Sequence, residues 1–281
     1  IHPARLGWRA FARNEGAAAM PHTIFPDELI FVSPGQRQPV PSVAGQRHEM
    51  AYDAMGQWSG TYDVTARAAP GDWQRFPGQD SILYLLSGRC RVEWGEAGEH
   101  AHVMAGGDFA LVGQGARHRM QALDDGDCRF VVFRLGEGGG QTLATLPNDI
   151  SFVSAAQREI GPCTPGQDRE KAFAEDGLWV GYCNITARGE PGAWHHHADY
   201  DSVMYLLSGR CRIDSGADGK TETEMKAGDF GFFGKGVIHR VQILDDGLCD
   251  YVFIRFGQGE SVFVVDGPGP RIWAAEDARA A

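Results

Sequence analysis

The chain has 281 residues, enough for one large domain or two of ordinary size. Hydrophobic residues make up 43% and charged residues 22%, which excludes a disordered chain, and no apolar run is long enough to cross a bilayer. The formal net charge is −11 and basic runs are absent, so we expect neither a nucleic-acid partner nor a membrane partner. The 38 glycines are typical of short strands joined by tight turns.

The six cysteines do not form a disulfide framework in this interpretation. Cys90 and Cys211 both occur in the sequence Gly-Arg-Cys-Arg, and Cys128 and Cys249 also occupy matching contexts. No Cys-x-x-Cys is present, so the pattern favours small buried thiols over a zinc ribbon or a redox dithiol. Reduced thiols and a first segment without a recognisable secretion signal predict a cytoplasmic location.

An internal repeat organises the chain. Residues 80–92 recur as residues 201–213, with ten of thirteen positions identical and an offset of 121. The same offset relates further short segments from about residue 31 to residue 136, a length that indicates duplication of a whole domain. We therefore predict a series of five regions along the chain: an N-terminal extension at 1–30, a first domain at 31–137, a linker at 138–150, a second domain at 151–260 and a tail at 261–281.

Each repeat has the pattern of short strands. Residues 83–86 and 204–207 are apolar runs that end at Ser-Gly, and residues 251–254 are β-branched or aromatic. Helical patterns are confined to residues 168–176 and the tail from Arg271. Many short strands with glycine turns predict an all-β protein built as a sandwich or barrel.

Two motifs in the second repeat resemble those of the cupin superfamily. Residues 189–209 fit the spacing Gly-x5-His-x-His-x3–4-Glu-x6-Gly, with Ser202 at the position of the usual Glu. Residues 228–243 fit the second motif, with Gly234 and Ile243 in place of its Pro and Asn. The resemblance implies two tandem double-stranded β-helix barrels of the jelly-roll-like cupin type, a few short peripheral helices, and a metal site in a barrel mouth.

His195 and His197 lie two residues apart on a predicted strand, so both side chains point to one face. Together with His239 of the second motif, they are the metal ligands that the resemblance implies. His196 points to the other face, where we expect it to stack or be exposed. Imidazole ligands suit several divalent transition metals. We expect one such ion per chain, Fe(II) in the first place, with Zn, Ni or Mn as alternatives.

The first domain lacks most of these ligands. At the offset of 121, Gln74 and Phe76 stand where the second domain has His195 and His197, and only His118 is retained. We therefore predict that the first barrel binds no metal and serves packing or dimerisation, with a homodimer as one expected assembly.

The fourth metal ligand is open at this point. Asp201 lies within the spacing that the family allows, but its counterpart Asp80 is present in the domain without the histidine pair, which favours a structural role such as capping a turn. Asp199 and Tyr200 occur only in the second domain, in a loop or beside the substrate. We take Asp201 and Tyr200 as the candidate catalytic residues.

Three neutral imidazoles leave the charge of a divalent ion uncompensated, so we expect a small-molecule substrate that is anionic or enolisable. Cupins with three histidines and no glutamate include Fe(II) dioxygenases. The resemblance therefore implies an oxidoreductase, a non-haem Fe(II) dioxygenase that acts on a small enolic, phenolic or carboxylic substrate. A redox-neutral lyase, isomerase or cyclase with Zn, Ni or Mn is the alternative. The third interpretation is a non-enzymatic bicupin that binds or stores a small molecule.

Overall fold

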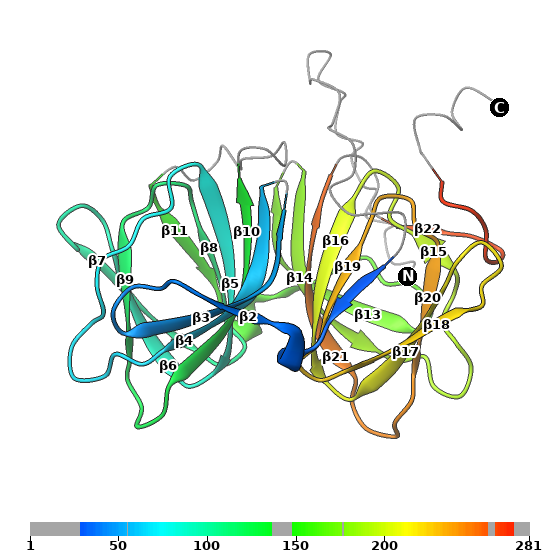
Figure 1. Cartoon of the computed structure of the whole chain (residues 1–281), viewed down its shortest axis with the longest axis horizontal. Coiled ribbons are helices and arrows are strands. Elements are labelled where there is room, and N and C mark those ends of the chain that lie inside the picture. The colour runs from blue at the N-terminus through cyan, green and yellow to red at the C-terminus, as the bar shows by residue number, and fades with distance from the viewer. Residues whose placement is uncertain (1–28, 55, 137–147, 176, 258–261, 273–281) are drawn as a thin grey trace, which may run out of the picture.

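The computed structural model describes residues 29–54, 56–136, 148–175, 177–257 and 262–272, which form two β-barrels side by side (Figure 1). The predicted all-β class is confirmed: the strands pair antiparallel, and the helices in the described ranges are two 3₁₀ turns, η1 (Pro34–Gln36) and η2 (Ala155–Gln157). No helix in these ranges is both long and apolar enough to span a bilayer.

The first barrel consists of one large and one small sheet. The large sheet has seven strands in the order β11 (Ile150–Val153), β8 (Phe109–Val112), β5 (Gln79–Ser87), β10 (Cys128–Gly136), β4 (Gln57–Val64), β3 (Gln46–Ala54) and β2 (Gln38–Val40). The small sheet has the order β7 (His100–Ala105), β6 (Arg89–Trp94) and β9 (His118–Ala122). Buried side chains from both sheets fill the space between them.

The second barrel repeats this plan. Its large sheet has the order β1 (Ile30–Val32), β19 (Phe230–Phe233), β16 (Asp201–Ser208), β21 (Asp250–Phe256), β14 (Leu178–Ile185), β13 (Gln167–Glu175) and β12 (Glu159–Ile160). Its smaller sheet has the order β18 (Thr221–Lys226), β17 (Arg210–Ser215), β20 (His239–Ile243), β15 (His195–His196) and β22 (Phe263–Val264).

The first strand of each repeat lies in the sheet of the other barrel. β1 pairs with β19, with Phe31 opposite Gly231, and β11 pairs with β8, with Phe152 opposite Ala110. In Figure 1 the blue β1 therefore lies beside the yellow strands of the second barrel. The sequence repeat had placed residue 31 in the first domain and residue 151 in the second. Each exchanged strand covers an edge that would otherwise be unpaired.

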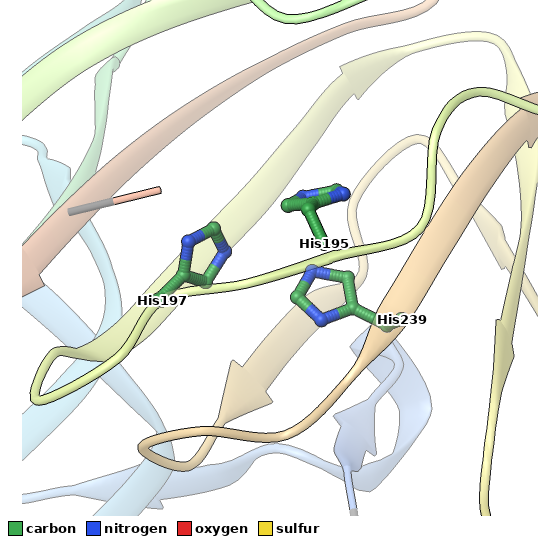
Figure 2. Close-up of side chains that lie close together, drawn as sticks. All are labelled: His195, His197 and His239. Atoms are coloured by element: carbon green, nitrogen blue, oxygen red, sulfur yellow. The ribbon is translucent and has the colours of Figure 1, made fainter. Parts of the chain in front are cut away.

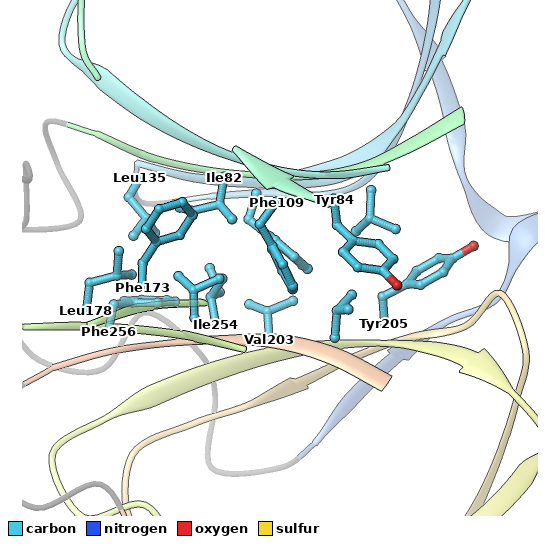
Figure 3. Packing of buried hydrophobic residues seen from close by; sticks show 14 of the residues in the cluster. Ile82, Tyr84, Phe109, Leu135, Phe173, Leu178, Val203, Tyr205, Ile254 and Phe256 are labelled. Atoms are coloured by element: carbon cyan, nitrogen blue, oxygen red, sulfur yellow. The ribbon is translucent and has the colours of Figure 1, made fainter. Parts of the chain in front are cut away.

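A further apolar core joins the two barrels (Figure 3). Ile82 and Phe109 of the first barrel and Val203 and Ile254 of the second belong to it, and all four are completely buried. Burial of a large apolar side chain contributes about 1.5–3 kcal/mol, so separation of the barrels would carry a large cost. The two barrels consequently form one structural unit.

The helix predicted at residues 168–176 is wrong, because this segment forms β13. Along that strand Gln167, Arg169 and Phe173 are buried, while Asp168 and Ala174 are exposed. Pairing with β14 supplies tertiary contacts that outweigh the helical propensity of the charged and alanine residues. The rest of the predicted tail helix, from residue 273, and the linker at 137–147 lie outside the described residues.

Candidate metal centre

Three histidine side chains meet inside the second barrel (Figure 2). His195 lies on β15, His197 follows that strand, and His239 begins β20 directly opposite His195 in register. The ring centroids are 4.5 Å apart for His195 and His239, 5.0 Å for His197 and His239, and 5.3 Å for His195 and His197. One ligand nitrogen of each ring lies within 4.8 Å of the others, and all three side chains are buried.

The hydrogen bonds of two of the rings, those of His195 and His239, leave a nitrogen lone pair free for a metal. The Nδ1 atom of His195 lies 3.0 Å from the carbonyl oxygen of Ala193, and Nδ1 of His239 lies 3.0 Å from that of Val237. Since a carbonyl oxygen only accepts, Nδ1 carries the proton in each ring and Nε2 keeps its lone pair. These bonds fix both the tautomer and the ring orientation.

Burial keeps the three imidazoles neutral. Desolvation, with smaller contributions from the positive charges of His239, Arg255 and Arg169, holds the pKa of His195 and of His197 well below the ordinary value. Burial also lowers the pKa of His239 to about 4. Three neutral, converging nitrogen donors fit a divalent transition metal. His195, His197 and His239 would therefore hold such an ion.

The backbone turns sharply after the histidine pair. Ala198 has a φ of 45°, which is uncommon for a residue with a side chain, and its amide donates a 3.1 Å hydrogen bond to Nδ1 of His196. His196 itself is buried and stacks on Phe263 of β22, with centroids 5.3 Å apart. Its ring thus serves packing beside the metal centre, and the stacking alternative predicted for it is the one that the structure shows.

Asp201 holds a turn in the second barrel. Its Oδ1 accepts a 3.0 Å hydrogen bond from the backbone amide of Lys235, four residues before His239. In the first barrel Oδ1 of Asp80 accepts the equivalent bond from the amide of Gln114, at 2.8 Å. The same contact in a barrel without the histidine pair points to a structural role. Asp201 is not a member of the histidine cluster.

Tyr200 and Asp201 both lie outside the lining of the cavity that the histidines enclose. The amide of Tyr200 donates a 2.8 Å hydrogen bond to the carbonyl of His197, and its side chain is buried. A catalytic role for either residue therefore stays a prediction. Both residues lie next to the loop that follows the metal-ligand candidate His197.

The cavity beside the histidines is small, with a volume of about 30 Å³, room for only a few small atoms. Ser202, at the position of the usual cupin glutamate, lines it with a hydroxyl that has no hydrogen-bond partner among the described residues. No aspartate or glutamate lines this cavity within the described ranges. The remaining lining is mostly apolar: Val203, Met204, Ile213, Phe233, Val241, Tyr251 and Phe253.

One charged side chain that we did not predict also lines the cavity. Arg255 is 3% exposed, and burial together with the positive charge of Arg169 lowers its pKa to about 9. Gln167 also lines the cavity and accepts hydrogen bonds from Arg169 at 2.5 Å and from the hydroxyl of Tyr251 at 2.7 Å. In the sequence, the sign of this residue is a cation inside the apolar run 251–256, at the position equivalent to Arg134 in the first repeat.

The first barrel retains only part of this arrangement. His118 is buried, with its Nδ1 2.9 Å from the carbonyl of Ala116, as for the metal-centre histidines. Phe76 and Gln74 replace the other two rings, and the guanidinium of Arg134 lies 3.6 Å from the centroid of Phe76. Among the described residues, the only cluster of three or more potential metal ligands is the one in the second barrel.

Comparisons with known proteins agree with this architecture. A family model described as a cupin domain matches residues 183–255. No curated protein sequence matches the chain. A formate complex of oxalate decarboxylase from Lactobacillus farciminis superposes with a TM-score of 0.63 at 13% identity, covering 84% of this chain and 88% of that one. A mutant of Bacillus subtilis oxalate decarboxylase gives 0.64 at 14% identity, covering 88% and 81%.

A further Bacillus subtilis oxalate decarboxylase structure, from work on its Mn(II) centres, also gives a TM-score of 0.64 at 14% identity and covers 88% of this chain and 81% of that one. At such identities the likeness establishes the shared fold of two tandem barrels.

Proposed function

We propose that this chain, a bicupin of the cupin superfamily, is a metal-dependent enzyme that acts on a small carboxylic substrate in its second barrel. The observation that carries the proposal is the donor set. His195, His197 and His239 are neutral, buried and convergent, and the cavity beside them contains no acidic side chain within the described residues. Such a site leaves both coordination positions and positive charge for an anionic substrate.

The reaction class that we favour is redox-neutral cleavage, of the lyase type. Structures with the same two-barrel fold include oxalate decarboxylases, one of them in complex with formate, and oxalate and formate are both small carboxylates. A bound divalent ion would supply Lewis-acid polarisation of a substrate oxygen. Manganese is the first candidate because one related structure concerns Mn(II) centres, with zinc and nickel next.

The residues of this chain would bind and shield the substrate. The ring of Phe233 packs against that of His239 with centroids 4.8 Å apart, and Met204 and Phe253 add further apolar lining that reduces the access of water. The hydroxyl of Ser202 is free to donate to a substrate oxygen. Exclusion of water strengthens every electrostatic contact made with the substrate.

A second candidate, an Fe(II) dioxygenase, is favoured by one specific observation. With Ser202 in place of the usual glutamate, the histidine cluster contains no carboxylate, and an all-imidazole site of this kind resembles that of cupin dioxygenases. The two candidates differ in their need for oxygen, so they can be separated directly.

The test begins with protein purified without chelators. We expect one transition-metal ion per chain by elemental analysis, and its loss in His195→Ala and His239→Ala but not in the matched His118→Ala variant of the first barrel. Turnover of small mono- and dicarboxylates is then measured with and without oxygen. Anaerobic turnover supports the lyase, strictly oxygen-dependent turnover supports the dioxygenase, and ligand binding without turnover supports a storage role and refutes the enzyme.

A further inference from the structure

We propose that Arg255 is the anion anchor of the second barrel, so that the site selects compact substrates with a free carboxylate beside the metal-binding oxygen. This inference rests on the proposed function and adds a specificity-determining residue to it. Arg255 lies on β21 directly opposite Ser202 of β16, and both side chains line the cavity that His195, His197 and His239 enclose. The guanidinium and the metal centre thus face the same small space.

The charge balance around Arg255 calls for an anion. Its Nε and Nη1 atoms have no hydrogen-bond partner among the described residues, and none of the ion pairs formed by those residues includes it. The second buried arginine, Arg169, adds another positive charge nearby rather than compensating the first. A buried charge without a counter-charge is costly. A carboxylate that accepts from the fork of N–H donors would remove that cost.

The equivalent arginine of the first barrel shows how the protein surrounds this cation where the histidine cluster is not present. Arg134 lies opposite Ser81 just as Arg255 lies opposite Ser202. Its guanidinium stacks on Phe76 at 3.6 Å and lies 4.9 Å from the Trp58 ring and 5.1 Å from the Tyr62 ring. Although Nε and Nη2 of Arg134 also have no hydrogen-bond partner among the described residues, three aromatic rings surround its cation, one of them the phenylalanine that replaces a histidine.

Within the described ranges, Arg255 has one such ring contact, with Phe253 at 4.8 Å. The ring that would correspond to Phe76 is His197, which belongs to the metal cluster. In the second barrel the equivalent cation lines a cavity, has fewer ring contacts and has two nitrogens without a hydrogen-bond partner among the described residues. That difference assigns the anion site to one barrel only.

The size of the cavity limits the substrate. About 30 Å³ accommodates two or three heavy atoms without movement of the walls. Short carboxylates require the least enlargement of this cavity to contact both the histidine centre and Arg255, which line it together. We therefore infer short dicarboxylates and 2-oxo or 2-hydroxy acids as the substrate class.

The experiment measures anion binding rather than turnover. Full-length protein loaded with Zn(II) is titrated calorimetrically with oxalate, with acetate and with acetamide, the neutral analogue of acetate. Wild-type protein should bind oxalate and acetate well and acetamide at least about tenfold more weakly than acetate. Arg255→Met should weaken oxalate and acetate binding by about 30-fold or more, with acetamide binding and the single Zn(II) ion retained.

Arg134→Met is the matched control and should leave all three affinities unchanged. Because Arg255 is unpaired without a ligand, Arg255→Met should unfold at an equal or higher temperature than wild type in the ligand-free state, whereas Arg134→Met should unfold at a lower one. Arg255→Lys, which keeps the charge, should lose less anion affinity than Arg255→Met and serves if the methionine variant fails to fold.

Equal wild-type affinity for acetate and acetamide would overturn the inference, as would unchanged acetate binding in a folded Arg255→Met or Arg255→Lys variant. The proposed function fails separately. Discrimination between acetate and acetamide without turnover of any carboxylate would leave Arg255 as an anion anchor and refute the enzyme. Turnover of a carboxylate with an unchanged KM in Arg255→Met would support the enzyme and refute Arg255 as the anion anchor.

Discussion

At the level of single residues, the charge of the metal centre depends on position 202. The usual cupin motif has glutamate there, and this chain has Ser202, whose hydroxyl enters the cavity opposite Arg255. A carboxylate at that position would satisfy both positive groups of the site, the metal and the guanidinium. Because this carboxylate is absent, the metal and the guanidinium both remain available to a substrate.

Ser202→Glu should therefore tighten metal binding, by about tenfold or more, while lowering both acetate affinity and turnover. The new carboxylate would take the place and the charge that an anionic substrate would occupy. Competition with a metal-sensitive dye measures the first effect and calorimetry the second. Ser81→Glu, at the equivalent position of the first barrel, should leave metal binding unchanged. Tighter metal binding with undiminished turnover would contradict the proposal that substrate compensates the charge of the metal.

Asp201 offers a second test because its contact with the amide of Lys235 can be separated from its charge. Asp201→Asn keeps an acceptor oxygen, so metal content should stay at one ion per chain. Asp201→Ala and its matched variant Asp80→Ala should each lower the free energy of unfolding by about 1–3 kcal/mol, because a buried amide loses its acceptor. Elemental analysis and urea unfolding measure the two effects. A sharp loss of metal in Asp201→Asn would show instead that the carboxylate binds the ion.

The histidines could be found from the sequence and the arginine could not, for a physical reason. His195 and His197 share a face because side chains alternate along a strand, and this local rule needs no knowledge of the fold. The position of Arg255 depends on the pairing of β16 with β21, which are far apart in the chain. The sequence of β21 predicts an apolar strand, and only the pairing shows where its one cation lies.

At the level of the strands, the two barrels exchange the first strand of each repeat, and comparison of the repeated sequences does not reveal this exchange. Both repeats contain the same Phe-Val-Ser sequence, at residues 31–33 and 152–154, so sequence comparison assigns each copy to its own half. Nothing local tells a strand which of two equivalent edges it will join. The short loop after each strand is equivalent too, since η1 and η2 carry matching Ser–Gln capping boxes.

Removal of β1 should damage the barrel that contains the metal centre, although β1 lies at the other end of the sequence. β1 covers the edge of β19, and Phe31 packs edge-to-face on Phe233, itself 4.8 Å from His239. Deletion of residues 1–33 should lower stability by roughly 3–5 kcal/mol and reduce solubility, from lost apolar burial and an open edge. Urea unfolding and metal content are compared with a deletion of residues 1–28 only. Equal values for the two deletions would show that β1 contributes nothing to the second barrel.

At the level of the whole molecule, the two barrels keep the same frame but differ in polarity. Besides His196, five buried histidines are distributed over them: His48 and His118 in the first, and the three of the metal centre in the second. Burial lowers the pKa of each below 6.5, to about 4 for His48 and His239. An unfolded chain therefore binds more protons than the folded one in this range.

After a chelator has removed the metal, the stability of the protein should consequently decrease as the pH decreases. The contribution of each such histidine is fully present above pH 6.5, the unfolded value, and is lost as the pH falls through its folded pKa, which is about 4 for His48 and His239. A histidine such as His239 should cost about 2 kcal/mol between pH 6.5 and pH 5. Urea unfolding at pH 7, 6 and 5 measures this decline, and His239→Gln should make it shallower, whereas the exposed His102→Gln should not.

Bound metal should make the pH dependence of the unfolding free energy steeper. A divalent ion binds only the neutral imidazoles, so it stabilises the folded protein at pH 7, and protons compete with it at three nitrogens as the pH falls. The stabilisation by added Zn(II), measured as the difference in unfolding free energy with and without the ion, should thus shrink from pH 7 to pH 4. It should be absent in His239→Ala at every pH and unaffected in His118→Ala. A Zn(II) effect of equal size in wild type and His239→Ala would show that the ion stabilises the protein from some other site.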